Sequence, residues 1–121
     1  MDTRDKITWI GKLHRKFDGR DWLAVVGTFD PLTLSHAERM AELSARGKPV
    51  LAVVEPGTNC LLPVEARAVL VAALRSVRLV VIAEADALAS FPQLEIVKDE
   101  EGERQRSLAF VEHVRGRQTA K

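Results

Sequence analysis

The sequence predicts one α/β domain with a parallel sheet, and three observations support this prediction. Short apolar runs recur along the chain, and segments with helical spacing of their apolar residues separate them. This alternation is typical of parallel strands joined by helices that cross over the sheet. The runs are continuously apolar, as in strands buried on both faces. With 121 residues, 46% of them hydrophobic, the chain is long enough to bury a core without disulfides.

Composition and charge exclude several classes of protein. Eighteen basic and seventeen acidic residues leave a net charge of +1, which is no basic field for nucleic-acid binding. The single cysteine, Cys60, forms no internal disulfide, and no Cys/His spacing indicates a zinc site. The polar amino-terminal segment lacks the apolar stretch of a secretory signal, and the apolar runs are too short to span a membrane. We therefore expect a cytoplasmic protein that binds neither nucleic acid nor membranes.

The first part of the chain predicts a helix, a turn and a strand. A helix is expected over residues 8–18, with Thr8 as its N-cap. Residues 17–21 have the composition of a turn, and residues 22–26 form the first buried strand, which Gly27 ends. The apolar stripe of the helix consists of Ile7, Ile10, Leu13, His14 and Phe17.

A longer helix and a second strand follow. Residues 35–46 place apolar side chains on one side and charged side chains on the other, and Gly47 is placed to end this helix. Residues 50–54 predict the second buried strand. Residues 55–59 have the composition of a turn.

The third helix and the third strand have equally clear signals. Pro63 opens the helix near its first turn, and Leu70, Val71 and Leu74 form its expected core stripe. Residues 79–82 predict the third buried strand.

The signals weaken after the third strand. Residues 87–92 indicate a short helix or a loop, and residues 94–97 a weaker fourth strand. The charged residues 98–106 are expected to form a solvated loop, and an amphipathic helix is expected from Ser107 onward. No internal repeat and no long linker divides the chain, so residues 1–121 are expected to form a single domain.

One segment, residues 25–40, has the features of a ligand site. A buried strand runs into a loop that opens a helix, and ligands bind at the carboxyl ends of strands in open parallel sheets. Gly27 permits close approach of backbone to a ligand, and the amides of Thr28 and Phe29 are placed to hold phosphate oxygens. The positive end of the following helix attracts an anion, and His36 there is placed to donate a hydrogen bond to a phosphoryl oxygen.

The same segment also has a purely structural interpretation. In that interpretation Asp30 and Pro31 form a turn, Ser35 caps the following helix, and His36 is a packing or capping residue.

Several other residues with reactive or aromatic side chains are expected to be structural. Trp9 and Trp22 are expected to fill the core or helix–sheet contacts, and His14 and His113 to lie on the surface. Cys60 is expected to be an ordinary small loop residue, because nothing identifies a base or a second thiol beside it.

Two blocks of the sequence resemble one family. Residues 27–36, GTFDPLTLSH, resemble the signature G-[ST]-F-D-P-x-[HT]-x-G-H of the cytidylyltransferase-like nucleotidyltransferases, and Thr33 resembles the T-x-G-H form of phosphopantetheine adenylyltransferases. Residues 61–82 are similar to the P-x-x-x-R-A-x-x-L-A-A-L-x-x-V-D-x-V-V-I segment in the adenylyltransferase domain of ADP-heptose synthases. That domain also has a K-I…L helix before the signature, which is similar to the residues Lys6, Ile7 and Leu13. The resemblance covers roughly residues 6–86.

The resemblance implies both a fold and an activity. The fold would be a small, Rossmann-like, doubly wound parallel sheet flanked by helices, as in nucleotidyltransferases of the HIGH type. The activity would be transfer of a nucleoside monophosphate from ATP, or from CTP, to a sugar phosphate or a related phosphorylated metabolite. Pyrophosphate would be released, with Mg²⁺ present. Such chemistry needs positioning and charge neutralisation rather than a covalent nucleophile.

The resemblance also implies roles for individual residues. The amides of Thr28 and Phe29 would hold triphosphate oxygens, Thr33 and His36 would contact the region of the α- or β-phosphate, and Arg67 would approach from the third element. It implies no metal ligand from the chain itself. The other residues of the implied nucleotide-binding loop are Gly27, Asp30 and Ser35.

The chain departs from the family pattern at several positions. Ser35 replaces a glycine, Arg78 stands where relatives often have aspartate, and residues 55–66 contain no Lys or Arg. The second signature of the family, I-S-[ST]-T-x-x-[RK], is absent, and Arg104 or Arg106 would have to replace its cation.

These departures leave two further hypotheses open. The first is a degenerate domain that binds a nucleotide or a partner protein without catalysis. The second is a homodimerisation module that pairs through the apolar stripes of residues 8–18 and 107–115.

Overall fold

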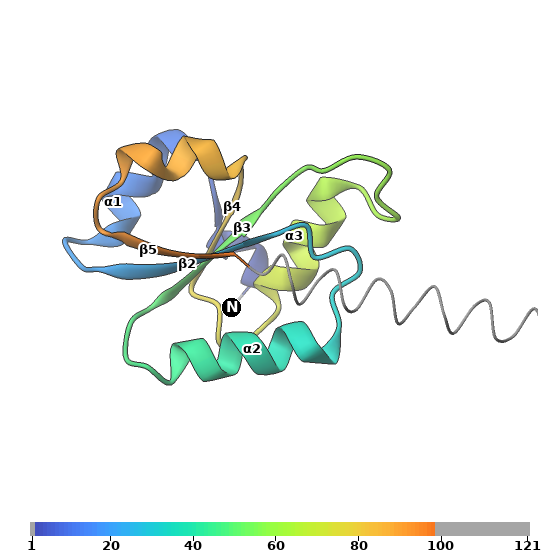
Figure 1. The fold of residues 1–121 in the computed structure, drawn as a ribbon, viewed down its shortest axis with the longest axis horizontal. Coiled ribbons are helices and arrows are strands. Elements are labelled where there is room, and N and C mark those ends of the chain that lie inside the picture. The colour runs from blue at the N-terminus through green and yellow to red at the C-terminus, as the bar shows by residue number, and fades with distance from the viewer. Residues whose placement is uncertain (1, 99–121) are drawn as a thin grey trace, which may run out of the picture.

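The computed structural model describes residues 2–98, and within them five parallel strands form one sheet (Figure 1). The strand order is β1-β4-β3-β2-β5. The strands are β1 (Ile7–Thr8), β2 (Trp22–Gly27), β3 (Val50–Val54), β4 (Leu79–Ile82) and β5 (Leu94–Lys98). The α-helices are α1 (Leu13–Phe17), α2 (Leu34–Ser44) and α3 (Val64–Ala72), and the 3₁₀ helices are η1 (Thr3–Lys6), η2 (Ile10–Lys12) and η3 (Ala85–Ser90).

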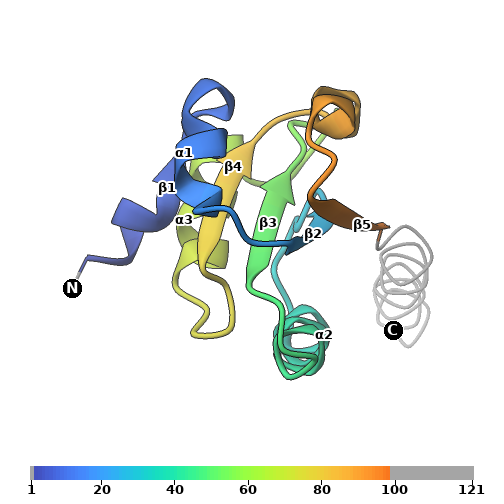
Figure 2. The same cartoon turned by 90° about the vertical axis from the view of Figure 1, so that its left-hand side faces the viewer.

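The order of the strands creates a switch point at β2. From β2 the chain adds β3 and then β4 on one side, and it later adds β5 on the other side of β2 (Figure 2). Gly27 pairs with Val54, and Val54 pairs with Ile82, so three neighbouring strands end at one level. In such sheets ligands bind where the direction of winding reverses, at the carboxyl ends of the strands. The loop after β2 therefore occupies the expected ligand position of a small Rossmann-like fold.

Helices cover both faces of the sheet. On one face α2 and α3 pack on Leu23, Val25, Ala52 and Val80. On the other face α1 and η3 pack on the alternate strand residues, which include Ala24, Val26, Leu51, Val53 and Val81. Every residue of β2 and β3 is buried, which confirms the prediction of strands buried on both faces.

The prediction for the amino-terminal segment is wrong at its start. Ile7 and Thr8 form the edge strand β1 and pair with Val80 and Val81 of β4. Within the range predicted as a helix, helical structure begins only at η2, and Trp9 rather than Thr8 precedes its first turn. Ile7 and Thr8 are β-branched. Their pairing with a strand distant in the sequence gives them an extended conformation, although the apolar residues around them have helical spacing.

The middle of the chain confirms the second and third strands and adjusts the helices. Helix α2 ends at Ser44, before the expected residue 46, and its N-cap is Thr33 rather than Ser35. The expected core residue Leu70 of α3 is 45% exposed. The expected core residue Val71 is buried, and Leu74 packs partly buried against the same core. The face of α3 that packs on the sheet also holds Arg67, Ala68 and Ala72.

The last two described elements, η3 and β5, lie close to the positions predicted for them. The segment expected as a short helix or loop is η3, and the weaker strand is β5, which lies at the edge beside β2. The charge run beyond Lys98, the helix expected from Ser107, and Arg104, Arg106 and His113 lie outside the described residues. Within residues 2–98, no helix is long and apolar enough to cross a membrane.

The two tryptophans differ. Trp22 is buried, and its Nε1–H donates to the carbonyl oxygen of Phe17 at 3.0 Å, as expected for a core residue. Trp9 is 76% exposed, so the prediction that it fills the core is wrong. Its backbone is extended and lies between β1 and η2, so it is not part of a helix that packs on the sheet. His14 is exposed as predicted, and its ring lies 4.5 Å from that of Phe91, centroid to centroid.

Candidate functional site

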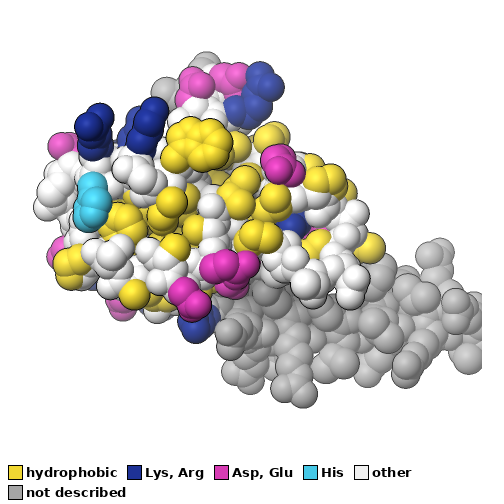
Figure 3. Space-filling view, turned by 90° about the horizontal axis from the view of Figure 1, so that it is seen from above, with side chains coloured by type: hydrophobic (Ala, Val, Ile, Leu, Met, Phe, Trp, Pro, Cys, Tyr) yellow, Lys and Arg dark blue, Asp and Glu magenta, His cyan; other side chains and the backbone are white. Residues whose placement is uncertain are grey.

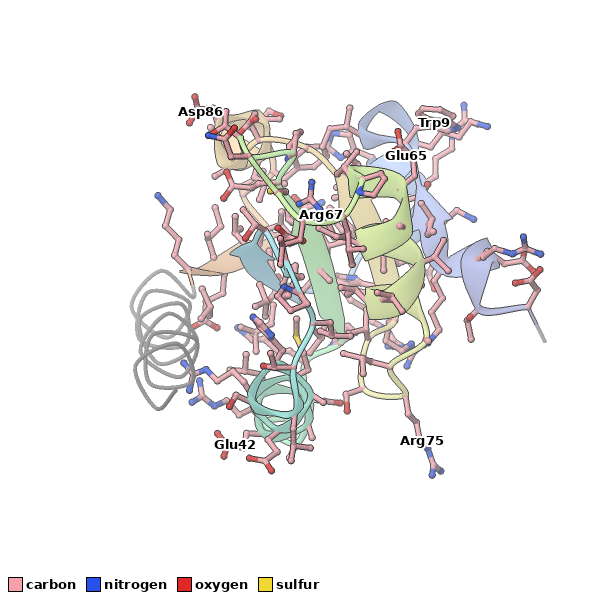
Figure 4. The ribbon with its side chains drawn as sticks, turned by 90° about the vertical axis from the view of Figure 1, so that its right-hand side faces the viewer. Trp9, Glu42, Glu65, Arg67, Arg75 and Asp86 are labelled. Atoms are coloured by element: carbon pink, nitrogen blue, oxygen red, sulfur yellow. The ribbon has the colours of Figure 1, made fainter. Side chains whose placement is uncertain are left out.

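The loop that leaves β2 at the switch point holds most of the sequence-predicted site residues. Figure 4 views the molecule from the side of this loop. Gly27 ends β2, and its carbonyl oxygen accepts the backbone N–H of Glu55 at 2.9 Å. Phe29 has a left-handed backbone, with φ of 52°, and its side chain is fully buried in the core beneath α2. The peptide bond between Asp30 and Pro31 is cis. The buried Phe29 ring thus anchors the loop to the core.

Asp30 connects this loop to the one that precedes α3. Its carboxylate accepts the backbone N–H groups of Leu61 and Leu62, the latter at 2.9 Å. These bonds join segments 31 and 32 residues apart in the chain. Asp30, which the sequence placed in the nucleotide-binding loop, therefore holds two loops together in this structure.

Thr33 and His36 form a reciprocal cap at the start of α2. The backbone N–H of Thr33 donates to Nδ1 of His36 at 3.0 Å, and the Thr33 hydroxyl lies 3.0 Å from the same nitrogen. The backbone N–H of His36 points back to the Thr33 hydroxyl oxygen at 3.5 Å. Because Nδ1 accepts from a backbone amide, the neutral ring carries its proton on Nε2. His36 can therefore donate a hydrogen bond only through Nε2.

His36 is also a core residue, since only 4% of its surface is exposed. Its ring lies 5.3 Å from the ring of Phe29, centroid to centroid. The sequence predicted either a phosphate contact or a capping and packing role for this residue. The structure shows the capping and packing contacts, and the phosphate contact stays a prediction.

Arg67 reaches from α3 into the loops at the centre of Figure 4. It is 2% exposed, and its guanidinium donates to backbone carbonyls of three segments. Nη1 bonds the oxygens of Thr28 and Glu55, each at 2.8 Å, and Nη2 bonds that of Pro56 at 2.6 Å. Nε bonds the oxygen of Leu62 at 3.0 Å. The sequence expectation that Arg67 approaches the loop after β2 is met.

The electrostatic consequence of this arrangement is a buried positive charge at the switch point. Within residues 2–98, each hydrogen bond of Arg67 ends on a neutral carbonyl oxygen, so none of these bonds neutralises the guanidinium. The amino-terminal end of α2, a helix of 11 residues, opens on the same side of the sheet and adds a positive partial charge. Both features favour an anion near this loop.

The remaining predicted site residues lie around this centre. Ser35 is exposed in the first turn of α2, and Thr28 is half-buried between β2 and Phe29. The roles expected for the amides of Thr28 and Phe29 stay predictions.

The structure adds residues that the sequence analysis missed. The carboxylate of Glu55 accepts the N–H of Ala85 at 3.3 Å, which ties the loop after β3 to η3. The Sγ of Cys60 donates to the carbonyl oxygen of Pro56 at 3.6 Å, beside the bond from Arg67.

The loop over residues 55–63 has an apolar character at this edge. It contains no Lys or Arg, and its Leu61 is 70% exposed. Figure 3 shows hydrophobic side chains gathered on one face of the molecule, with charged side chains around them.

Among residues 2–98, no group of three or more His, Cys, Asp or Glu side chains is placed to hold a metal ion.

The family models that were scanned and the curated proteins that were searched contain no match to this chain. The fold and the contacts of the loops after β2 and β3 are therefore the basis for a functional proposal.

Proposed function

We propose that this chain binds a nucleotide through its phosphates at residues 27–36 and transfers a nucleoside monophosphate to a phosphorylated small molecule. The donor is ATP or CTP, the acceptor is a sugar phosphate or a related metabolite, and pyrophosphate is released. One observation carries the proposal: the buried guanidinium of Arg67, bonded to neutral carbonyls, lies at the switch point beside the loop that opens α2. The resemblance of GTFDPLTLSH to the nucleotidyltransferase signature supports the same site.

The reaction suits such a site because it needs little covalent chemistry from the protein. A phosphate oxygen of the acceptor attacks the α-phosphorus of the nucleotide, and the bond from that phosphorus to the bridging oxygen breaks. Pyrophosphate leaves with the electron pair of that bond. The charge of Arg67 and the amino-terminal end of α2 favour the phosphates, and Nε2–H of His36 is the donor proposed for a phosphoryl oxygen.

A second candidate is nucleotide binding without turnover. It is favoured by the lack of Lys and Arg over residues 55–66 and by the engagement of the Arg67 guanidinium in carbonyl bonds. Both candidates share the binding site, and release of pyrophosphate distinguishes them.

Three substitutions of His36 separate its capping role from its binding role. Glutamine and glutamate at this position of a helix retain the bond to the N-cap amide, whereas alanine loses it. We expect His36→Ala to lower the free energy of unfolding by about 2 kcal/mol, because it loses both the cap and the contact with Phe29. His36→Gln keeps the cap and should cost less. His36→Glu keeps the cap but buries a carboxylate at a position that is 4% exposed, so it should cost at least as much as His36→Ala, and its binding is compared under conditions where it is folded. Thermal and urea unfolding followed by circular dichroism measure this.

Calorimetric titration with ATP and with CTP, each with Mg²⁺, then tests binding. The wild type should bind one of them, and His36→Glu should weaken binding about tenfold or more, because a carboxylate repels phosphate and donates no hydrogen bond. The matched control is His14→Ala, an exposed histidine on α1, which should bind as the wild type does. No heat with either nucleotide, or binding that His36→Glu leaves unchanged, would contradict the proposed site.

Turnover is tested by adding a panel of sugar phosphates and measuring released pyrophosphate. Release that depends on both substrates and is lost in His36→Glu supports nucleotidyl transfer. Binding without release across the panel supports the second candidate.

A further inference from the structure

Helix α3 is apolar on its outer face as well as on its inner face. Arg67, Ala68, Val71 and Ala72 are buried against the sheet. On the other side, Val69 is 40% exposed and Leu70 is 45% exposed. A surface helix normally places charged or polar residues on its outer side, and one that is apolar all around is usually covered. The outer face of α3 thus has the composition of a contact surface.

The outer stripe of α3 is symmetrical in its spacing and in the size of its side chains. It consists of Ala66, Val69, Leu70 and Ala73, so small residues lie at its two ends and larger ones at its centre. The spacing is i, i+3, i+4 and i+7, which is one face of a helix. A two-fold axis through the centre would place Val69 on Leu70 of a second copy, and Ala66 on Ala73. A partner of unrelated sequence would require no such symmetry.

The charged residues near the two ends of the stripe also fit an antiparallel pair of α3 helices. Glu65 is exposed in the first turn of α3, and Arg75 is exposed just after its last turn. In Figure 4 the two side chains lie at opposite ends of the helix. An antiparallel pair of α3 helices would bring Glu65 of each copy within reach of Arg75 of the other. Opposite charges at such positions select the antiparallel orientation.

We propose that the outer face of α3 is the contact through which two copies of this chain associate about a two-fold axis. The pairing is isologous, so each copy contributes the same residues. The proposal differs from pairing through residues 8–18 and 107–115, and it does not depend on the proposed nucleotide site. Strand β5, which ends the described residues, lies at one edge of the sheet, whereas α3 contacts β1 at the other edge.

The extent of the surface sets the expected affinity. Stable complexes bury about 800 Å² on each partner, and a helix of nine residues is too short to supply this alone. Trp9, 76% exposed, directly follows β1, which contacts α3, so it adds apolar surface on this side of the molecule. The association is therefore weak, with a dissociation constant in the micromolar range.

Sedimentation equilibrium of the full chain over low to high micromolar concentrations tests the proposal. The average mass should rise from that of a 13.4 kDa monomer toward twice that value. Leu70→Glu should raise the dissociation constant about tenfold or more, because it places a charge at the centre of the contact. The matched control is Leu34→Glu, a leucine 74% exposed on α2, which should leave association unchanged. Circular dichroism verifies that both variants fold.

Charge reversal tests the orientation. Glu65→Arg and Arg75→Glu should each weaken association, and the double variant should restore it, because each cross-copy pair is then opposite in charge again. A chain that stays monomeric at high micromolar concentration would overturn the proposal. So would a dimer that Leu70→Glu leaves intact, since its contact would then lie on another face or involve the segment after Lys98.

Discussion

Arg67 is the largest fully buried side chain among the described residues, and it is also charged. Its planar guanidinium joins the segments after β2 and β3 to the start of α3 through bonds in three directions. Lysine has a single charged nitrogen on a flexible stem and cannot reproduce this fork.

We therefore expect Arg67→Lys to lower the free energy of unfolding by about 3 kcal/mol, since buried carbonyls lose partners and a buried charge loses its bonds. Urea unfolding followed by circular dichroism measures this loss. Arg78→Lys, at an exposed arginine, is the matched control and should change the free energy by less than about 0.5 kcal/mol. An equal, small effect of both substitutions would show that the carbonyl bonds contribute little.

At the level of single residues, the sequence predicted where the site lies better than what each residue does. Thr33, His36 and Arg67 were all placed near the loop after β2, and they are found there. The cap between Thr33 and His36 was not predicted as a pair, because it depends on the side-chain rotamer of His36. The bonds from Asp30 to the loop before α3 depend on a contact between segments about thirty residues apart, which spacing along the chain does not show.

Among the connecting segments, the loop after β3 depends on Gly57. Its φ is +66°, and an added Cβ would lie 3.0 Å from Sγ of Cys60 and 3.2 Å from Cγ2 of Thr28. Gly57→Ala should destabilise the protein by about 1–2 kcal/mol, because the residue would be both crowded and in the left-handed region.

The matched control for this loop is Gly11→Ala, where an added Cβ meets nothing within 4 Å. This substitution should be neutral or slightly stabilising. Thermal unfolding of the two variants measures the difference. Equal melting temperatures would mean that the loop relaxes without cost.

The strands could be predicted where the burial of their own residues is enough to determine an extended conformation. The strands β2, β3 and β4 are continuous apolar runs, and their positions were predicted almost to the residue. Strand β1 has two residues and exists through its pairing with β4, so no local pattern could reveal it. In α3 the alanines pack on the sheet and Leu70 faces outward, the reverse of what side-chain size suggests. The apolar pattern thus identified the helix and the inward positions of Val71 and Leu74, but not those of the alanines or of Leu70.

On the scale of the whole molecule, the two cores share the same strands. Leu51 and Val53 of β3 face one core, and Val50, Ala52 and Val54 face the other. Loss of either core would expose strands that the other requires, so we expect the described part of the chain to unfold as one unit.

Trp22 provides a measurement of this cooperativity. In a Trp9→Phe variant the remaining tryptophan is buried beside α1, and its fluorescence reports one core. Its urea transition should coincide with that of far-ultraviolet circular dichroism, which reports all helices and strands. Two separate midpoints would show that the faces of the sheet unfold independently.

The pairing of β1 has a consequence for the order in which the chain can fold during its synthesis. Ile7 and Thr8 pair with β4, and Nζ of Lys6 donates to the carbonyl oxygen of Leu74, 68 residues further along. Ribosomes add about 5–20 residues each second, so this segment emerges several seconds before its partners. Strands β2 and β3 can pair in that interval, whereas β1 must wait at the ribosome with its backbone groups unpaired. Residues 6–8 are thus made before strands β2 and β3 but can dock only after β4 has been made.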